Sequence, residues 1–378
     1  MTTHKQEPRQ NRLSPPFRAD HVGSFLRPAY LVAARERHKA GEIGADDLRE
    51  IEDRAILEIV DFQENLGLRS ITDGEFRRGA FHTDFLRHLG GVTITHPARK
   101  SGGGSSQGFS PPVMRITGKV EHVQDIEVAN FAFLAKATSR TPKVTIPSPT
   151  MLHFRGGREA IDAAIYPDLD QFYADVAAAY RVELAHLTAA GARYVQFDDT
   201  NLAYLCDPAQ RAQARERGLD PDRLPHDYAR FINMAIADRP ATMVTAIHLC
   251  RGNFRSNWAA EGGYEPVAEI LFNALEIDAY FLEYDDARSG GFAPLRFVPP
   301  NKTVVLGLVT TKLDQLEARD EILRRIDEAS RYLPLDQLCL SPQCGFSSTV
   351  QGNAIAAESQ AAKLRLVVDI AREVWGTS

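Results

Sequence analysis

Three short segments, far apart in the chain, carry side chains that bind metals. They are His248 and Cys250 in TMVTAIHLC, Glu283 in AYFLEYDD, and Cys344 in QLCLSPQC. Each segment reads as the end of an apolar β-strand. Residues i and i+2 of a strand point to the same face, so the imidazole of His248 and the thiol of Cys250 should converge. Four N, S and O donors on neighbouring strand ends match the tetrahedral coordination of Zn²⁺.

The spread of these ligands over residues 248–344 favours a catalytic metal, because structural zinc usually uses closely spaced pairs in loops. Two thiolates, one carboxylate and one neutral imidazole leave a zinc site with a net charge of −1. Such a site is a weak Lewis acid, but it keeps a bound sulfur electron-rich. A substrate thiol should bind deprotonated and displace the weakest ligand, Glu283. The pattern therefore predicts a thiol alkyltransferase. The alternatives are a buried Cys beside a hydrogen-bonded His, or a closed zinc site in a non-enzymatic binding barrel.

The other two thiols have simpler interpretations. Cys339 lies inside the last strand pattern, LCLS, and is expected to be a core residue. Cys206 follows the fourth predicted strand and is expected to have no role in the chemistry.

Two acids and a turn are candidates for holding the substrate. Glu75 in TDGEF and Asp198 in YVQFDD are expected to bind an ammonium group; the alternatives are a salt bridge to the arginines that follow Glu75, or a helix N-cap. Gly23 and Ser24 would offer a backbone N–H and a hydroxyl to a carboxylate, although an ordinary turn fits as well.

Composition excludes several classes of protein. The 378 residues are 44% hydrophobic and 25% charged, which is typical of a globular chain, and the formal net charge of −6 argues against nucleic-acid or anionic-membrane partners. The first residues contain no apolar signal-peptide region, and no segment approaches the roughly 20 apolar residues of a membrane span. Four cysteines are too few for a disulfide scaffold. We expect a soluble, cytoplasmic enzyme.

Short apolar runs alternate with longer helical patterns along the chain, which predicts a single (β/α)₈ TIM barrel. The helical segments 45–67 and 169–191 repeat apolar residues at spacings of three and four, and each ends at a glycine. The active sites of such barrels lie at the carboxyl ends of the strands. The predicted strands are Asp20–Ser24, Ser70–Asp73, Val144–Pro147, Tyr194–Asp198, Met243–His248, Ala279–Glu283, Val304–Leu308 and Gln337–Ser341.

Two regions fall outside the repeating pattern. Residues 1–16 are polar and proline-bearing, which predicts a mobile arm before a catalytic domain at 17–378. Residues of about 88–142 hold SGGGSSQGFSPP and VMRITGKVEHV, which predict an excursion after the second strand, a loop or hairpin over the barrel mouth. A doubly wound sheet is the alternative fold, but the chain has no Gly-rich nucleotide-binding fingerprint.

The segments HVGSF, TDGEF, YVQFDD, HLC, FLEYD and SPQCG resemble, in this order, the catalytic barrel of cobalamin-independent methionine synthase. HVGSFLRP, LEYDDARSG and LCLSPQCGF are typical of its short, single-barrel relatives. The resemblance extends from about Arg18 to the end of the chain. It implies a (β/α)₈ barrel with a catalytic zinc that transfers a methyl group from methyltetrahydrofolate to the thiolate of homocysteine, giving methionine.

The resemblance also implies a role for individual residues. Gly23 and Ser24 match the turn that holds the amino-acid carboxylate, and Glu75 and Asp198 match the acids that hold its ammonium group. The residues that match the zinc ligands are His248, Cys250, Glu283 and Cys344.

Two departures from the family pattern concern the methyl donor. The full-length synthase has a second, N-terminal barrel that helps hold the folate, and this chain has none. Its histidine that protonates the leaving folate nitrogen falls here at about Thr311–Lys312, so the candidate proton donors are Lys312 and His21. Folate, methylcobalamin and a small methylated compound therefore remain possible donors, and the oligomeric state remains open.

A second enzyme class shares this architecture. In epoxyalkane:coenzyme M transferases, zinc activates a sulfonated thiol that opens an epoxide. A sulfonate calls for cationic residues, whereas Glu75 and Asp198 favour an amino-acid thiol.

Overall fold

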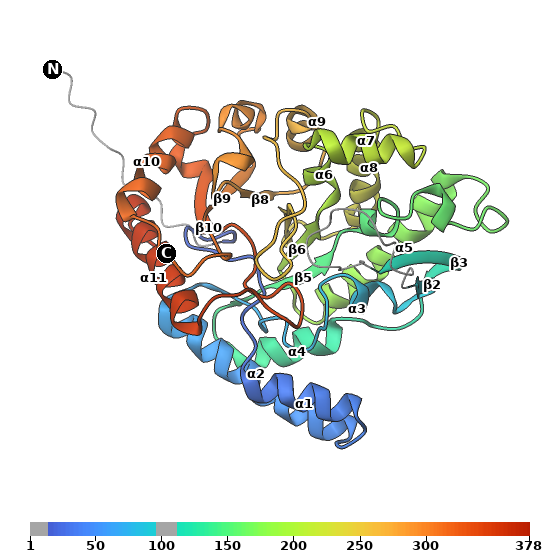
Figure 1. Cartoon of the computed structure of the whole chain (residues 1–378), viewed down its shortest axis with the longest axis horizontal. Coiled ribbons are helices and arrows are strands. Elements are labelled where there is room, and N and C mark those ends of the chain that lie inside the picture. The colour runs from blue at the N-terminus through green and yellow to red at the C-terminus, as the bar shows by residue number, and fades with distance from the viewer. Residues whose placement is uncertain (1–13, 96–111) are drawn as a thin grey trace.

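The structure, a computed structural model, describes residues 14–95 and 112–378 and has mixed α/β architecture (Figure 1). Six parallel strands form one continuous sheet in the order β10-β9-β8-β7-β6-β5, and β1 pairs in parallel with β4. Seven of these eight strands match predicted strands in place, and the two-residue β4 was not predicted. Their bounds are β1 Ser70–Ile71, β4 Thr141–Pro142, β5 Val144–Pro147, β6 Tyr194–Asp199, β7 Val244–Leu249, β8 Ala279–Glu283, β9 Thr303–Val309 and β10 Leu338–Pro342.

The first predicted strand, Asp20–Ser24, does not form a ladder. A single parallel bridge joins Ala19 to Leu340 of β10, and the N–H of Phe25 reaches Gly74 O beyond β1. The side chain of Asp20 accepts the N–H of His21, which occupies a backbone donor that a ladder would need. The segment therefore lies between β10 and β1 and continues the wall without being a regular strand.

Three side chains, from β6 and from positions next to β1 and β5, bond to the segment where a ladder would otherwise do so. Its carbonyls at residues 21, 22 and 23 accept hydrogen bonds from Lys143, Gln196 and Thr72, respectively. Each of these donors lies on or beside a different strand, so the segment is attached to the interior of the wall rather than to one neighbour.

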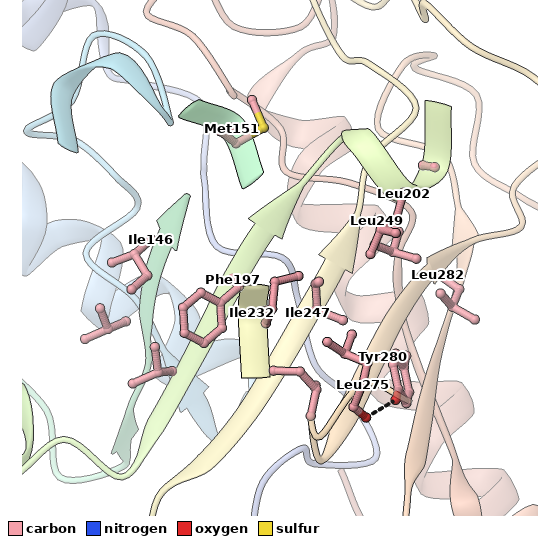
Figure 2. Close-up of a cluster of buried hydrophobic side chains, with 14 of the residues drawn as sticks. Ile146, Met151, Phe197, Leu202, Ile232, Ile247, Leu249, Leu275, Tyr280 and Leu282 are labelled. Carbon is pink, nitrogen blue, oxygen red and sulfur yellow. Dashed lines mark hydrogen bonds between the residues drawn. The ribbon is translucent and has the colours of Figure 1, made fainter. Parts of the chain in front are cut away.

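Successive side chains along each strand point to opposite faces, and this alternation separates two buried layers. Tyr194, Ala246, Phe281 and Val305 belong to one cluster, on the inner face of the wall. Their immediate neighbours in sequence belong to a larger cluster that packs against the helices, and Figure 2 shows part of it. The labelled members are Ile146, Met151, Phe197, Leu202, Ile232, Ile247, Leu249, Leu275, Tyr280 and Leu282.

The two helices predicted with the clearest periodicity are present. α2 buries Ile56, Ile59 and Val60 at helical spacing and ends at Gly67, whose φ of 92° gives the left-handed C-cap that glycine favours. Asp168 is the N-cap of α5, and its carboxylate accepts the N–H of Asp170. The helices are α1 Ala29–Lys39, α2 Ala45–Leu66, α3 Thr83–Leu86, α4 Val128–Ala137, α5 Leu169–Ala189, α6 Asn201–Tyr204, α7 Pro208–Glu216, α8 Leu224–Ile236, α9 Ala268–Asn273, α10 Arg319–Ser330 and α11 Ala357–Trp375.

One connection departs from the repeating strand–helix pattern. Between β8 and β9, the chain forms two 3₁₀ turns, η3 Ala287–Ser289 and η4 Ala293–Phe297, and no α-helix in residues 284–302. Three prolines and two adjacent glycines in this segment oppose a continuous helix, because proline lacks the N–H and glycine is conformationally free. The other 3₁₀ turns are η1 Pro149–Leu152, η2 Arg158–Ala160 and η5 Leu335–Gln337.

The predicted excursion after the second strand contains an antiparallel hairpin, β2 Leu89–Thr95 and β3 Val113–His122. The N–H of Val120 donates to the hydroxyl of Tyr166, just before α5, and Ile116 bridges to Ile161. The strands therefore pack beside α5 (Figure 1). The loop at 96–111, expected over the mouth, lies outside the described residues, as does most of the arm predicted at 1–16.

No helix in the two described stretches has both the length and the apolar composition that a membrane crossing requires.

We expect Ile247→Ala to destabilise the protein by about 2–5 kcal/mol, because it leaves a cavity in the buried layer between β7 and the helices. The measurement is the shift of the urea unfolding midpoint. Leu57→Ala on α2 is the matched control: its side chain is 49% exposed, and its effect should stay within about 0.5 kcal/mol. Equal effects for the two variants would contradict the assignment of Ile247 to a packed layer.

Candidate metal centre and active site

The structure brings His248, Cys250, Glu283 and Cys344 together. One donor atom from each lies within 4.8 Å of every other, and all four residues are buried. His248 lies in β7, two residues after the inward-facing Ala246, and Cys250 directly follows the end of that strand, as the spacing of two predicts. Glu283 is the last residue of β8, two residues after the inward-facing Phe281. The Sγ atoms of Cys250 and Cys344 are 3.5 Å apart. The carboxyl ends of three strands thus meet at one small cluster of donors.

The electrostatics of this cluster suit a thiophilic cation. The hydrogen bond between the two sulfurs raises the pKa of the Cys250 thiol and lowers that of Cys344, so the pair shares one proton. Burial alone would lower the pKa of His248, but the neighbouring Cys344 raises it above its usual value. A divalent metal takes the place of such shared protons, because it binds thiolate and neutral imidazole. Two sulfurs, one nitrogen and one oxygen form a donor set that fits zinc.

Glu283 is surrounded by cationic groups. Its Oε1 accepts the backbone N–H of Arg251 at 2.9 Å, and its Oε2 lies 3.3 Å from the guanidinium of Arg288. The Nζ atom of Lys312 lies 3.9 Å from the same Oε2 and makes no hydrogen bond within the described part of the chain. These cations weaken the carboxylate as a ligand, since they draw electron density from the same oxygen. Lys312 therefore does lie at the donor cluster.

Asp198 and Glu75 form a pair of buried acids beside this cluster. Asp198 pairs in register with His248 of the adjacent strand. Burial, with the charge of Glu75 next, raises the pKa of Asp198 to about 7, and burial also raises the pKa of Glu75. Arg78 lies 3.7 Å from Glu75 and opposes its shift. Two buried acids whose pKa values are both raised form a site where a further cation would be stabilised.

Gly23 and Ser24 lie next to these acids. Gly23 has a φ of 141°, and a Cβ atom there would come within 3.0 Å of the Glu75 Oε1 atom, so the close approach needs glycine. The Oγ atom of Ser24 accepts the N–H of Ser347. Glu75 itself has a φ of 59°, a left-handed conformation that is rare outside glycine and is a frequent mark of functional sites.

His21 lies in a different environment from the one expected of a proton donor. Its Nε2 atom contacts the carbonyl of Ser70, the first residue of β1, and its ring packs on Phe25. The strand ends that carry the metal-ligand candidates are at the opposite, carboxyl end. Burial, with the charge of Lys143 next, lowers the pKa of His21 to about 4, so the ring is neutral near pH 7. The structure therefore gives His21 no support as an acid.

The remaining candidates occupy structural positions. Cys339 is fully buried in the inner apolar cluster, as expected, and the thiol of Cys206 donates to the carbonyl of Leu202 in α6. Asp199 points to the opposite face from Asp198, because the two are adjacent in a strand. Its Oδ1 accepts the N–H of Leu202 at the start of α6.

Sequence reasoning assigned no role to Arg288, which contacts both Glu283 and Asp285. It lies in the segment LEYDDARSG, where an arginine three residues after an acid was the available signal. Arg78 was considered only as an alternative partner for Glu75, yet it also lies 3.4 Å from Glu127 and so links two buried acids. The contacts of Arg288 with Glu283 and of Arg78 with Glu127 were missed because neither has a periodic signature in the sequence.

Residues 17–373 match the family of cobalamin-independent synthase catalytic domains. The chain belongs to this family. The uncharacterized protein YxjH of Bacillus subtilis is 46% identical over 362 residues, which cover 95% of each chain. The 5-methyltetrahydropteroyltriglutamate–homocysteine methyltransferase of Bacillus licheniformis is 26% identical over 359 residues, which are 94% of this chain but 42% of that protein.

A solved structure supports the fold as well. A protein from Listeria monocytogenes, described as a vitamin-B12-independent methionine synthase, is 40% identical and superimposes with a TM-score of 0.76 over 96% of this chain and 98% of its own. The predicted resemblance to the cobalamin-independent synthase family and the predicted barrel-type α/β fold are thereby confirmed.

We expect Cys250→Ser and Cys344→Ser to abolish zinc binding at the cluster of His248, Cys250, Glu283 and Cys344, because the thiolates carry most of the affinity. Glu283→Gln should weaken it without abolishing it, since Arg251 and Arg288 already engage that carboxylate. The first measurement is the amount of zinc per chain after dialysis. The second is the sulfur-to-metal absorption of a cobalt-substituted sample, which reports only the ion bound by the cysteines of the cluster. Cys206→Ser and Cys339→Ser are matched controls that should keep the ion. Retention of the thiolate-type absorption in the Cys250→Ser, Cys344→Ser double variant would show that the ligands are wrong.

Proposed function

We propose that this chain is a zinc-dependent methyltransferase that methylates the thiol of homocysteine to form methionine. The observation that carries the proposal is the position of two buried acids, Glu75 and Asp198, directly beside a cluster of two thiols, one imidazole and one carboxylate. Membership of the cobalamin-independent synthase family supports methyl transfer in general. The match to homocysteine methyltransferases supports the choice of acceptor.

The cluster explains how a thiol becomes a nucleophile at neutral pH. His248, Cys250, Glu283 and Cys344 would hold zinc, which lowers the pKa of a thiol that binds to it and keeps the sulfur electron-rich. Arg288 and Lys312 flank Glu283, so this carboxylate retains cationic partners when it is not a ligand. It is therefore the group that yields its place to a substrate sulfur at the lowest electrostatic cost.

The acids account for an amino-acid substrate. An ammonium group between Glu75 and Asp198 would neutralise two buried carboxylates, each of which has a raised pKa without it. Because the Oγ of Ser24 accepts the N–H of Ser347, its own O–H is available to donate to the substrate carboxylate. Together these groups bind both charged ends of an amino acid and leave its side chain directed at the thiol cluster.

The transfer step itself requires little from the protein beyond alignment and one proton. The thiolate sulfur attacks the methyl carbon, an S–C bond forms, and the bond from that carbon to the donor breaks with its electron pair leaving on the donor. A leaving amine nitrogen, as in methyltetrahydrofolate, must then gain a proton. The Nζ atom of Lys312, buried beside Glu283 with no hydrogen-bond partner in the described residues, is the group that would supply it.

We expect homocysteine to bind better than a thiol of like length that lacks the amine. A charge-assisted hydrogen bond contributes roughly 1.5–3 kcal/mol, or about ten- to a hundredfold in affinity for each acid. Asp198→Asn and Glu75→Gln should each remove most of this preference, with the metal content unchanged. The measurement is thiol binding to the zinc-loaded protein by calorimetry. Better binding of a sulfonated thiol would instead favour the epoxide-opening class.

The binding of methionine, which has the amine but no thiol, should depend on pH. Asp198 has a pKa of about 7 in the free protein, so it loses its negative charge as the pH falls through that value. We therefore expect the affinity for methionine to decrease below pH 7. The Asp198→Asn variant should bind weakly with a flatter profile, whereas a wild-type affinity independent of pH would contradict this use of Asp198.

We expect Lys312→Met to slow methionine formation from methyltetrahydrofolate triglutamate by roughly 10²- to 10⁴-fold, the usual contribution of a positioned acid. Turnover with a methylated corrinoid, whose leaving group needs no proton, should change much less. Zinc content and thiol binding should be retained. His21→Gln serves as the control, because His21 contacts Ser70 at the amino end of β1, whereas the metal-ligand candidates lie at the carboxyl ends of their strands. A folate-dependent rate unaffected by Lys312→Met would show that the proton comes from elsewhere.

A further inference from the structure

A second group of metal-binding side chains lies outside the mouth, where β3 ends beside α5. It consists of His122, the last residue of β3, Asp125 in the loop that follows, and His186 in the last turn of α5. One donor atom from each lies within 4.8 Å of the others. In Figure 1, β3 and α5 lie on the opposite side of the view from β9 and β10, so this group is separate from the thiol cluster.

The imidazole of His122 is oriented by a buried carboxylate. Its Nε2 atom lies 2.7 Å from Oε2 of Glu183, a residue whose side chain is 1% exposed. Glu183 also accepts the backbone N–H groups of Ile126 and Glu127 and is therefore held in place. An imidazole that donates its Nε2 proton to a carboxylate presents a lone pair on Nδ1. This carboxylate–histidine arrangement is the one that usually supports a metal ligand.

The other two side chains are accessible to an ion from solvent. The Nδ1 atom of His186 lies 2.6 Å from Oδ1 of Asp125, and both side chains are about half exposed. The His122 and His186 rings are 5.4 Å apart and nearly perpendicular. Glu183 and His186 are three residues apart on α5 and so share one face of the helix. His186 lies at the carboxyl end of the helix, where the backbone dipole favours a cation.

The donor set indicates which cations would bind. Two imidazoles and one carboxylate suit zinc, nickel, cobalt or copper, whereas calcium and magnesium prefer an all-oxygen site. Bonds of about 2.0–2.2 Å from zinc to nitrogen and oxygen require small movements of the two exposed side chains, Asp125 and His186. Water would complete the coordination.

We propose that His122, Asp125 and His186 form a second site, which binds a divalent transition-metal ion and fastens the β2–β3 hairpin to α5. The ion replaces the proton shared by Asp125 and His186, and Glu183 supports His122 from behind. The same loop continues to Glu127, which meets Arg78 at 3.4 Å, and Arg78 lies 3.7 Å from Glu75. An ion at this site would thus hold in place the loop that carries Glu127, which is linked through Arg78 to Glu75.

The test is zinc binding by the full-length, metal-stripped and reduced chain, measured as zinc per chain at equilibrium dialysis. We expect the wild type to bind one ion more than His186→Ala or Asp125→Asn. These two variants carry the test, because both side chains are exposed and neither supports the fold as Glu183 does. His226→Ala is the matched control, since His226 is an exposed histidine on α8 and its loss should not change the count.

Variants that combine substitutions in both sites distinguish the ion of the second site from the ion of the thiol cluster. In a Cys250→Ser, Cys344→Ser background, the remaining ion should be lost on adding His186→Ala, and a cobalt-substituted sample should lack sulfur-to-metal absorption. Zinc should also slow hydrogen exchange in residues 113–127 of that background. The proposal is overturned if the wild type, His186→Ala and Asp125→Asn bind equal amounts of zinc, or if the extra ion persists in the combined variant. Either result leaves the assignment of the thiol cluster unaffected.

Discussion

The burial of negative charge is the constraint on which the rest of the mouth depends. Glu75, Asp198, Glu283 and a thiol pair are all removed from water within one small volume. An uncompensated buried ion costs several kcal/mol, so each group must share a proton, meet a cation or be neutralised by a ligand. The cations Arg288 and Lys312 compensate the charge of Glu283, whereas Arg78 compensates that of Glu75 only in part. This incomplete compensation is the physical basis of the metal and ammonium binding proposed above.

Much of this arrangement was predictable from the sequence because it follows from alternation in strands. Once β7 and β8 are recognised, the inner positions of His248, Cys250 and Glu283 follow from a period of two, and the parallel order places their ends at one rim. The helices α2 and α5 were equally predictable, since their apolar periodicity and terminal glycines are local signals. In these strands and helices, the packing of the folded chain agrees with the secondary structure that the local sequence favours.

The remainder depends on contacts that leave no pattern in the chain. The first segment was expected to be a strand, but its carbonyls are bonded by side chains from 143, 196 and 72, residues that no local rule connects to it. His21 was a candidate proton donor because it is close to Gly23 in the sequence. That proximity does not reveal that its ring contacts the carbonyl of Ser70. The proximity of His122 to His186 likewise arises only when a hairpin docks on a helix.

The left-handed backbone at Glu75 has a consequence for how this protein can change. A non-glycine residue in that conformation costs on the order of 1–3 kcal/mol, and glycine would relieve most of it. Selection or engineering for thermal robustness alone would therefore drift toward glycine at this position and discard an acid that faces the mouth. Retention of glutamate under such pressure would be evidence that catalysis, rather than durability, governs this turn. Under the proposed role of Glu75, stability and activity would compete at a single residue, and a more robust catalyst would have to gain its stability elsewhere in the fold.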